Sequence, residues 1–249
     1  MEGYGPSTYG ARWAGIYDDW TRQRLGTSTE ATVDGLAELA AGGRVLELAI
    51  GTGRVALRLV DRGLEVHGID ASDAMVARLR AKPGGDAIPV AIGDFADVDV
   101  DGRFDLVFVA FNTFFALTTQ DDQVRCFDNV ARHLTADGVF VIEAFVPDLG
   151  RFDAGQAVRV MRVTTDLVDL EASTHDAAAQ SVTTQHVVIS EEETQLQPVH
   201  LRYAWPSELD LMARLAGLAL RHRWAGWDRS AFTSSSGQHV SIYGRREPA

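Results

Sequence analysis

The sequence contains little cysteine, little positive charge and no long apolar run. Its 249 residues include one cysteine, Cys126, which excludes an internal disulfide framework and is typical of proteins from a reducing cytoplasm. Acidic residues outnumber basic ones by 35 to 23, and the net charge of -12 argues against a nucleic-acid substrate. No apolar run is long enough to span a bilayer, and the N-terminus lacks the charged start and the apolar stretch of a secretory signal. We therefore expect a cytoplasmic protein with a small or cationic partner and without a nucleic acid or a membrane as partner.

The first 150 residues alternate short apolar segments with amphipathic ones. Hydrophobic residues make up 46% of the chain and charged residues 23%, which are ordinary values for a globular protein with a sizeable core. Strands are predicted at 44–50, 64–70, 87–95, 104–111 and 138–146, and helices at 29–40, 54–63, 72–82 and 120–134. This alternation favours a doubly wound α/β fold, in which helices cover both faces of a parallel sheet.

The pattern changes after Pro147. From about Val158 to Tyr203, polar and apolar residues alternate without helical spacing, and polar turns separate the segments, which predicts antiparallel strands. A further helix is predicted at 207–218, followed by a closing pair of strands at 220–227 and 239–246. An insertion of about 45 residues is too long for a simple loop, so we expect a separate antiparallel sheet.

Arg44–Arg54, RVLELAIGTGR, runs from a buried strand into two glycines before the next helix begins. Glycines at such a turn let a ligand approach the backbone N–H groups. Asp70 ends the second strand roughly 20 residues later, where a carboxylate can accept hydrogen bonds from ribose hydroxyls. A glycine turn without a ligand and an Asp70 that only caps the next helix are the structural alternatives. The third glycine of a dinucleotide site is absent, which disfavours a dinucleotide-dependent reductase.

An acidic residue, Glu47, precedes the glycines. Its carboxylate would repel a phosphate but attract an amino group. Asp94 and Phe95 form a GDF motif after the third strand, where the acid can accept from an adenine amino group and the ring can line the base. A ligand that has an ammonium group, a ribose and an adenine is S-adenosylmethionine.

Five motifs follow one another along this part of the chain: ELAIGTG (47–53), GIDAS (68–72), GDF (93–95), FDLVFVAFNTFF (104–115) and ARHLTADGVFVIE (131–143). In this order and spacing, the chain resembles the class I S-adenosylmethionine-dependent methyltransferases over about residues 40–145. The resemblance implies a mostly parallel, seven-stranded, Rossmann-like sheet, with S-adenosylmethionine as cofactor and S-adenosylhomocysteine as product. Ala49 departs from the family, which usually has a glycine there.

The resemblance also implies which residues hold the cofactor. Glu47 orients the methionine part, Gly51 gives room for it, and Asp70 binds the ribose hydroxyls. Phe111 faces the reactive methyl group, whereas Met75 fits the adenine pocket and a plain core position equally well. The complete predicted set is Tyr9, Trp13, Trp20, Glu47, Gly51, Gly53, Asp70, Ala71, Met75, Asp94, Phe95 and Phe111.

Segment 7–20, STYGARWAGIYDDW, is similar to the cofactor-covering N-terminal helix of enzymes of the glycine N-methyltransferase type. On one helix, Tyr9 and Tyr17 lie about two turns apart and face the same side, where their hydroxyls suit an amine. Asn112 and Phe115 follow the fourth strand, where the substrate must lie. The predicted catalytic residues are Tyr9, Tyr17, Asn112 and Phe115. The alternatives are aromatics that only hold the segment to the core, and an asparagine that only caps a turn.

The seven histidines show no metal-ligand spacing, and no metal is expected. His133 fits a core helix, while His175, His186 and His200 lie in the insertion and fit surface or lid positions better than that of a base. Methyl transfer to oxygen usually needs a strong base or a metal. These observations therefore favour a nitrogen acceptor.

The segments NTFF, ARHL and LMARLAGL look like those of actinobacterial natural-product N-methyltransferases, of the cypemycin N-terminal and lincosamide-pathway type. We therefore predict N-methylation of a small-molecule or peptide amine in antibiotic or other specialised-metabolite biosynthesis. A C- or O-methyltransferase and a non-catalytic cofactor-binding module are the alternatives, and a homo-oligomer is left open. The predicted parts are a helical cap (1–40), the cofactor-binding core (41–150), an antiparallel lid over the substrate (151–204) and a C-terminal helix with closing strands (205–249).

Overall fold

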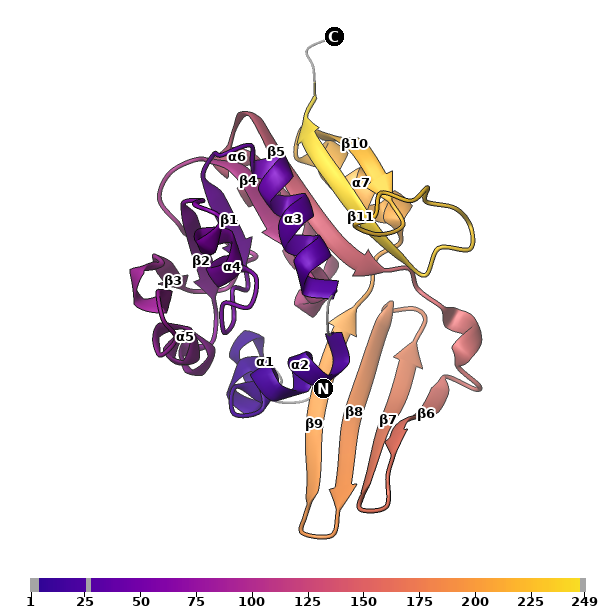
Figure 1. The fold of residues 1–249 in the computed structure, drawn as a ribbon. Helices are drawn as coiled ribbons and strands as arrows, with labels where there is room; N and C mark the ends of the chain where they lie inside the picture. The colour runs from indigo at the N-terminus through magenta and orange to yellow at the C-terminus, as the bar shows by residue number, and fades with distance from the viewer. Residues whose placement is uncertain (1–4, 26–27, 247–249) are drawn as a thin grey trace.

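The computed structural model describes residues 5–25 and 28–246, and its centre is a seven-stranded sheet with the order β10-β11-β5-β4-β1-β2-β3 (Figure 1). The five strands from β3 to β5 run parallel, whereas β11 is antiparallel to both of its neighbours. This arrangement confirms the predicted fold class. The strands are β1 (Val45–Leu48), β2 (Val66–Asp70), β3 (Val90–Ile92), β4 (Phe104–Val109), β5 (Leu134–Phe145), β10 (Leu218–Trp224) and β11 (Gln238–Arg245).

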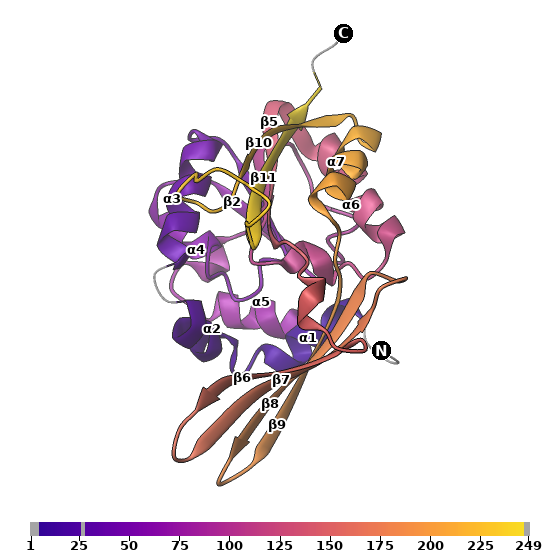
Figure 2. The same cartoon turned by 90° about the vertical axis from the view of Figure 1, so that its right-hand side faces the viewer.

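Helices cover both faces of this sheet, as Figure 2 shows with the sheet seen nearly edge-on. One apolar core joins the sheet to α3 (Ser28–Ala40), α4 (Ala56–Asp61) and α5 (Asp73–Arg80), and the other joins it to α6 (Gln120–His133) and α7 (Pro206–Leu215). Apolar residues at helical spacing explain this packing, because they place one apolar stripe of each helix on the sheet. Three short 3-10 helices, at Gly85–Ala87, Thr113–Ala116 and Leu149–Arg151, complete the connections. Within the described residues, no helix combines the length and the apolar character needed to cross a membrane.

The segment after β5 forms a second sheet of four antiparallel strands, as the sequence predicts. Its strands are β6 (Gln156–Val163), β7 (Leu167–Asp176), β8 (Ser181–Ser190) and β9 (Thr194–Arg202), paired in chain order. In both views this sheet projects from the core beside the N-terminal helices. At its base, the guanidinium of Arg202 lies 2.7 Å from the carboxylate of Glu208 on α7 and donates to Gln123 on α6 at 2.6 Å. These buried contacts fix the second sheet to the core.

The N-terminal segment forms two helices, α1 (Pro6–Trp13) and α2 (Tyr17–Leu25), where the sequence predicts a single one. The chain turns at 14–16, which includes Gly15, a residue with low helix propensity. Helix α1 packs against both α5 and β9. Its approach to α5 requires glycine, since a Cβ atom on Gly10 would lie 2.3 Å from the side chain of Ser72. Helix α1 thus connects the core to the second sheet.

Candidate functional site

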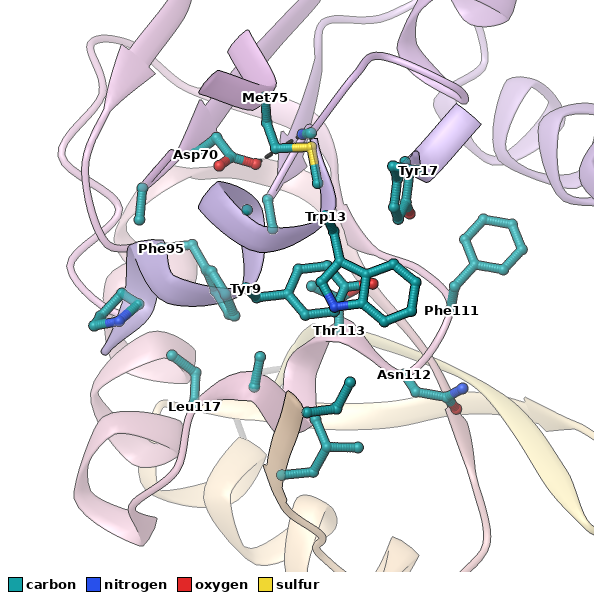
Figure 3. Close-up of a pocket in the computed structure, with 18 of the residues that line it drawn as sticks. Tyr9, Trp13, Tyr17, Asp70, Met75, Phe95, Phe111, Asn112, Thr113 and Leu117 are labelled. Carbon is teal, nitrogen blue, oxygen red and sulfur yellow. Dashed lines mark hydrogen bonds between the residues drawn. The ribbon is translucent and has the colours of Figure 1, made fainter. Parts of the chain in front are cut away.

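A cavity of about 430 Å³ lies at the carboxyl ends of the parallel strands, under α1 and α2 and against β8 and β9. Ligand pockets typically measure roughly 300–1,000 Å³, so a cofactor-sized molecule fits. Figure 3 shows Asp70 and Met75 on one side, Tyr17 and Phe111 on another, and Tyr9 and Trp13 between them. Among the sequence-predicted site residues, those that line the cavity are Tyr9, Trp13, Tyr17, Trp20, Gly51, Asp70, Ala71, Met75, Asp94, Phe95, Phe111 and Asn112.

Asp70 connects the glycine turn to the start of α5. One carboxylate oxygen accepts from the amide of Gly51 at 2.7 Å, and the other accepts from the amide of Ser72 at 2.8 Å. Burial raises the pKa of the Asp70 carboxyl, and these two hydrogen bonds oppose the shift. Each carboxylate oxygen has a further lone pair, so Asp70 can hold the turn and still accept from two ribose hydroxyls.

Met75, Asp94 and Phe95 give one part of the cavity two apolar surfaces and one carboxylate. Met75 and Phe95 are 3% and 8% exposed and both line the cavity. Asp94 accepts from the amide of Ala96 at 2.9 Å, which fixes its carboxylate at the cavity wall. Two apolar surfaces and one acceptor can bind the faces and the amino group of a purine.

Two predicted cofactor residues, Glu47 and Gly53, do not line the cavity. Glu47 is buried in β1, where burial raises its pKa to about 8 against the effect of the nearby Arg54 cation. Gly53 has a φ of 76°, and a Cβ atom there would lie 2.3 Å from the side chain of Leu79. Both residues therefore support the glycine turn from the side that faces away from the cavity.

Arg54 also lines the cavity, a position that its place in the sequence did not predict. Its Nη1 donates to Thr29 Oγ1 at 2.9 Å, which ties the turn to α3. Its Nε is buried and has no hydrogen-bond acceptor among the described residues. A buried guanidinium donor of this kind fits a ligand carboxylate. The signal in the sequence was an arginine directly after the glycine turn.

An aromatic cluster from α1 and α2 covers the cavity. The ring centroids of Tyr9 and Trp13 lie 5.3 Å apart, those of Tyr9 and Tyr17 6.4 Å, and those of Trp13 and Trp20 4.9 Å. Trp13 is fully buried, and its Nε1 donor has no partner among the described residues. The two tyrosines thus meet across the turn between two helices rather than along one helix. Burial raises the pKa of the Tyr17 hydroxyl and the Arg54 guanidinium opposes this, so the hydroxyl stays protonated at neutral pH.

His186 on β8 also lines the cavity, although the sequence favoured a surface or lid position for it. Its ring stands edge-on to Trp13 and Trp20, with centroid distances of 5.4 and 5.9 Å. Its Nδ1 lies 3.5 Å from a carboxylate oxygen of Glu171 on the neighbouring strand. The alternation of β8 would have placed His186 on one face with Val182 and Thr184, but it could not tell which face meets the cavity.

The other histidines singled out in the sequence have structural contacts. His133 bonds to two backbone oxygens, His175 contacts the hydroxyl of Tyr203 at 2.9 Å, and His200 contacts Thr183 at 2.7 Å. None of the three lines the cavity. Over residues 5–25 and 28–246, no three His, Cys, Asp or Glu side chains are grouped so that they could hold a metal ion.

The turn after β4 has a strained backbone. Phe111 and Asn112 have φ values of 55° and 69°, a region that non-glycine residues rarely adopt. Glu143 holds both, since its carboxylate accepts from the amide of Phe111 at 3.1 Å and its backbone oxygen accepts from the amide of Asn112 at 3.0 Å. The side-chain oxygen of Asn112 accepts from the amide of Phe145 at 2.6 Å, as in the turn-capping alternative. The turn separates this cavity from a second one of about 590 Å³.

Phe115, predicted as catalytic, does not reach the cavity. The short helix Thr113–Ala116 directs its side chain into the main core, where it is fully buried, 4.9 Å from the ring centroid of Phe145. Thr113 and Ala116 line the cavity instead. On this short helix, neighbouring residues therefore point to different sides, and Ala116 faces the cavity while Phe115 faces the core.

The comparisons with known proteins agree with this geometry. Residues 45–138 match a family model described as a methyltransferase domain. The structure of the CcbJ methyltransferase from Streptomyces caelestis aligns with a TM-score of 0.92 and 40% identity, over 98% of this chain and 100% of that chain. The chain belongs to the S-adenosylmethionine-dependent methyltransferases. The predicted family and the predicted cofactor are thereby confirmed.

Two further relatives extend the comparison. The methyltransferase is 27% identical to the cypemycin N-terminal methyltransferase of a Streptomyces species over 208 residues, which cover 82% of this chain and 84% of the relative. The S-adenosylmethionine-bound structure of CalS10, an amino pentose methyltransferase from Micromonospora echinaspora, shares the fold at 21% identity with a TM-score of 0.72, over 93% of this chain and 97% of that one. The cavity of the methyltransferase is lined by two carboxylates, Asp70 and Asp94, and by the guanidinium of Arg54.

Proposed function

We propose that the methyltransferase methylates the nitrogen of a small-molecule or peptide amine in specialised-metabolite biosynthesis. The observation on which this proposal rests is the meeting of Tyr9 and Tyr17 in a cavity that Phe111 and the imidazole of His186 also line. An amine needs acceptors for its N–H groups and a route for its proton, and these residues provide both. The similarity to a peptide N-terminal methyltransferase supports the same acceptor class.

The mechanism relies on positioning. When bound, S-adenosylmethionine supplies an electrophilic methyl group on its sulfonium. The hydroxyl oxygens of Tyr9 and Tyr17 accept hydrogen bonds from the amine and direct its lone pair at that methyl group. Because burial keeps Tyr17 protonated, it acts as a neutral hydrogen-bonding group and not as a phenolate base. Correct alignment of two reactants can supply much of an acceleration of this kind.

The proton of the amine leaves toward β8. His186 from β8 lines the cavity and accepts this proton, and the carboxylate of Glu171, 3.5 Å from its Nδ1, stabilises the imidazolium that forms. Val199 and Leu201 from β9 line the same cavity and exclude water. In this proposal the four-stranded sheet is the substrate lid that the sequence predicts, and the cytoplasm remains the predicted compartment.

Two other functions share the fold and the cofactor. A C- or O-methyltransferase would differ only in its acceptor, and a non-catalytic module would bind the cofactor without turnover. The tyrosine pair favours nitrogen over oxygen and carbon as the acceptor, because an array of neutral hydroxyls suits an amine better than an acidic oxygen or carbon nucleophile, which needs a strong base.

A screen for the acceptor tests the proposal. The purified chain is incubated with methyl-labelled S-adenosylmethionine and a panel of primary and secondary amines, amino sugars and peptides with free N-termini, together with phenols and catechols. We expect label on a nitrogen of at least one amine, located by tandem mass spectrometry. Label on oxygen or carbon alone would support the alternative chemistry, and cofactor binding without any transfer would support the non-catalytic module.

A further inference from the structure

A carboxylate on α2 joins the glycine turn to the end of α5. Asp18 Oδ1 accepts a hydrogen bond from Thr52 Oγ1 at 2.6 Å, and Asp18 Oδ2 lies 2.8 Å from the ammonium of Lys82. The same ammonium donates to the backbone oxygen of Thr52 at 2.8 Å. These three residues form a closed triangle, which we call the Asp18 latch.

The Asp18 latch is partly shielded from water. Thr52 is 1% exposed, and the side chains of Asp18 and Lys82 are 37% and 29% exposed. Hydrogen bonds to charged groups are the stronger class, and shielding from solvent reduces their screening by salt. Lys82 is the single lysine among the 249 residues, so its side-chain amine can be followed separately from the arginine side chains.

The Asp18 latch is joined to the glycine turn of the cofactor site through Thr52. Thr52 lies between Gly51, whose amide is bound by Asp70 at 2.7 Å, and Gly53, which packs against α5. Asp18 directly follows Tyr17, which lines the cavity. A displacement of the glycine turn is therefore transmitted through one side chain to the start of α2 and to a residue at the reaction site.

We infer that Asp18 is a positioning residue for the methyl transfer, and that its latch must open for the cofactor to exchange. Helices α1 and α2 cover the cavity, with Trp13 fully buried, so displacement of these helices would widen the path by which a cofactor enters and leaves. A bound cofactor contacts the glycine turn and the aromatic residues of both helices at once, which favours the closed arrangement. The latch thus couples occupation of the turn to the placement of Tyr17.

If Asp18 were only a structural tether, it would contribute to the stability of the fold and not to the binding of the cofactor. It would stabilise the fold equally with and without cofactor, and its removal would leave cofactor affinity unchanged. A latch that couples the glycine turn to Tyr17 contributes to cofactor affinity and slows the release of the cofactor.

Binding measurements on Asp18→Asn separate these roles. Calorimetry gives the dissociation constant of S-adenosylmethionine, and stopped-flow tryptophan fluorescence gives the release rate of S-adenosylhomocysteine. We expect both to rise about tenfold, with a much smaller effect for Asp19→Asn, which makes the same charge change one position along α2. Thr52→Val should act like Asp18→Asn, and Thr52→Ser, which keeps the hydroxyl, should restore wild-type values. Unchanged affinity and release in Asp18→Asn would overturn the inference.

A second measurement uses the wild-type protein and needs no variant to fold. The rate at which an N-hydroxysuccinimide acetate reagent acetylates Lys82 is followed by peptide mass spectrometry, with the N-terminal amine of the chain as internal reference. Saturating S-adenosylmethionine should slow acetylation of Lys82 at least severalfold relative to that reference. Equal rates with and without the cofactor would show that the latch does not respond to it.

Discussion

The guanidinium carbon of Arg54 lies 3.7 Å from the centre of the Phe111 ring, so that a residue after the first strand contacts one after the fourth. Both line the cofactor cavity, and the contact holds the strained turn after β4 against the glycine turn after β1. A cation above an aromatic face is attracted by the ring quadrupole, more strongly when both are shielded from water. Arg54 is therefore fixed in place before a ligand arrives, with one donor still available.

Arg54→Met should weaken the binding of S-adenosylmethionine. The variant keeps the apolar stem of the side chain and removes the buried donor that fits the cofactor carboxylate. We expect a dissociation constant roughly 10- to 100-fold higher, since a hydrogen bond between charged groups contributes about 1.5–3 kcal/mol. Calorimetry measures this, with Arg58→Met, on α4 and four residues later in the chain, as the control. Equal affinities for the two variants would contradict the assignment.

Asp70→Asn should also weaken cofactor binding, for a different reason. The substitution removes the charge and replaces one acceptor oxygen by a donor, while Gly51 and Ser72 both present N–H groups to that side chain. We expect an affinity loss of roughly 10- to 100-fold for S-adenosylmethionine. The control is Asp73→Asn, an exposed acid in the first turn of α5. A folded Asp70→Asn protein with wild-type affinity would disprove the ribose role.

The buried carboxyl of Glu47 makes the stability of the fold depend on pH. Its pKa of about 8 in the folded protein lies above the ordinary value of 4.5, so the folded state keeps a proton that the unfolded chain releases. This contribution is complete below about pH 4.5 and is lost as the pH rises toward 8, at up to roughly 1.4 kcal/mol per pH unit. Burial raises the pKa of Asp70 and Glu143 as well, so these acids act in the same direction.

Glu47→Gln should therefore lose less stability than the wild type as the pH rises. We expect the free energy of unfolding, measured by urea titration without cofactor at pH 5.5 and 7.5, to fall by less in the variant. The difference should approach that for one proton, about 2.7 kcal/mol across this interval. Glu192→Gln, on an exposed hairpin turn, serves as the matched control. A slope identical to that of the wild type would show that Glu47 ionises normally.

The sequence specified the core of this protein well and its cavity less completely. Strand and helix periodicity and the acid that ends β2 are local features of the sequence, and they located the glycine turn that lines the cavity. The inward rotation of Phe115 and the position of His186 depend on contacts between distant segments. Arg54 became a candidate only once its unpartnered donor and its contact with Phe111 were visible.

His186→Phe tests the proposed proton acceptor. Phenylalanine keeps a ring against Trp13 and Trp20 but has no nitrogen, so cofactor binding should change little. With an acceptor identified in the screen, we expect turnover to fall about 100-fold, a typical contribution of acid–base catalysis. His200→Phe makes the same change on β9 at a position that does not line the cavity, and it should keep wild-type turnover. Equal rates for the two variants would leave His186 as a packing residue.

The double substitution Tyr9→Phe with Tyr17→Phe separates positioning from packing. The rings lie 6.4 Å apart and keep their contacts in the variant, whereas both hydroxyls are lost from the cavity. A neutral amine would then have no acceptors to hold its lone pair toward the methyl group, so we expect turnover at saturating amine to fall at least 100-fold. Each lost hydroxyl should change folding stability by about 1 kcal/mol, so the protein should fold and bind S-adenosylmethionine nearly as the wild type does. Turnover is measured by mass spectrometry of the methylated amine and stability by urea titration. Wild-type turnover in the double variant would show that the two tyrosines only hold the N-terminal helices to the core.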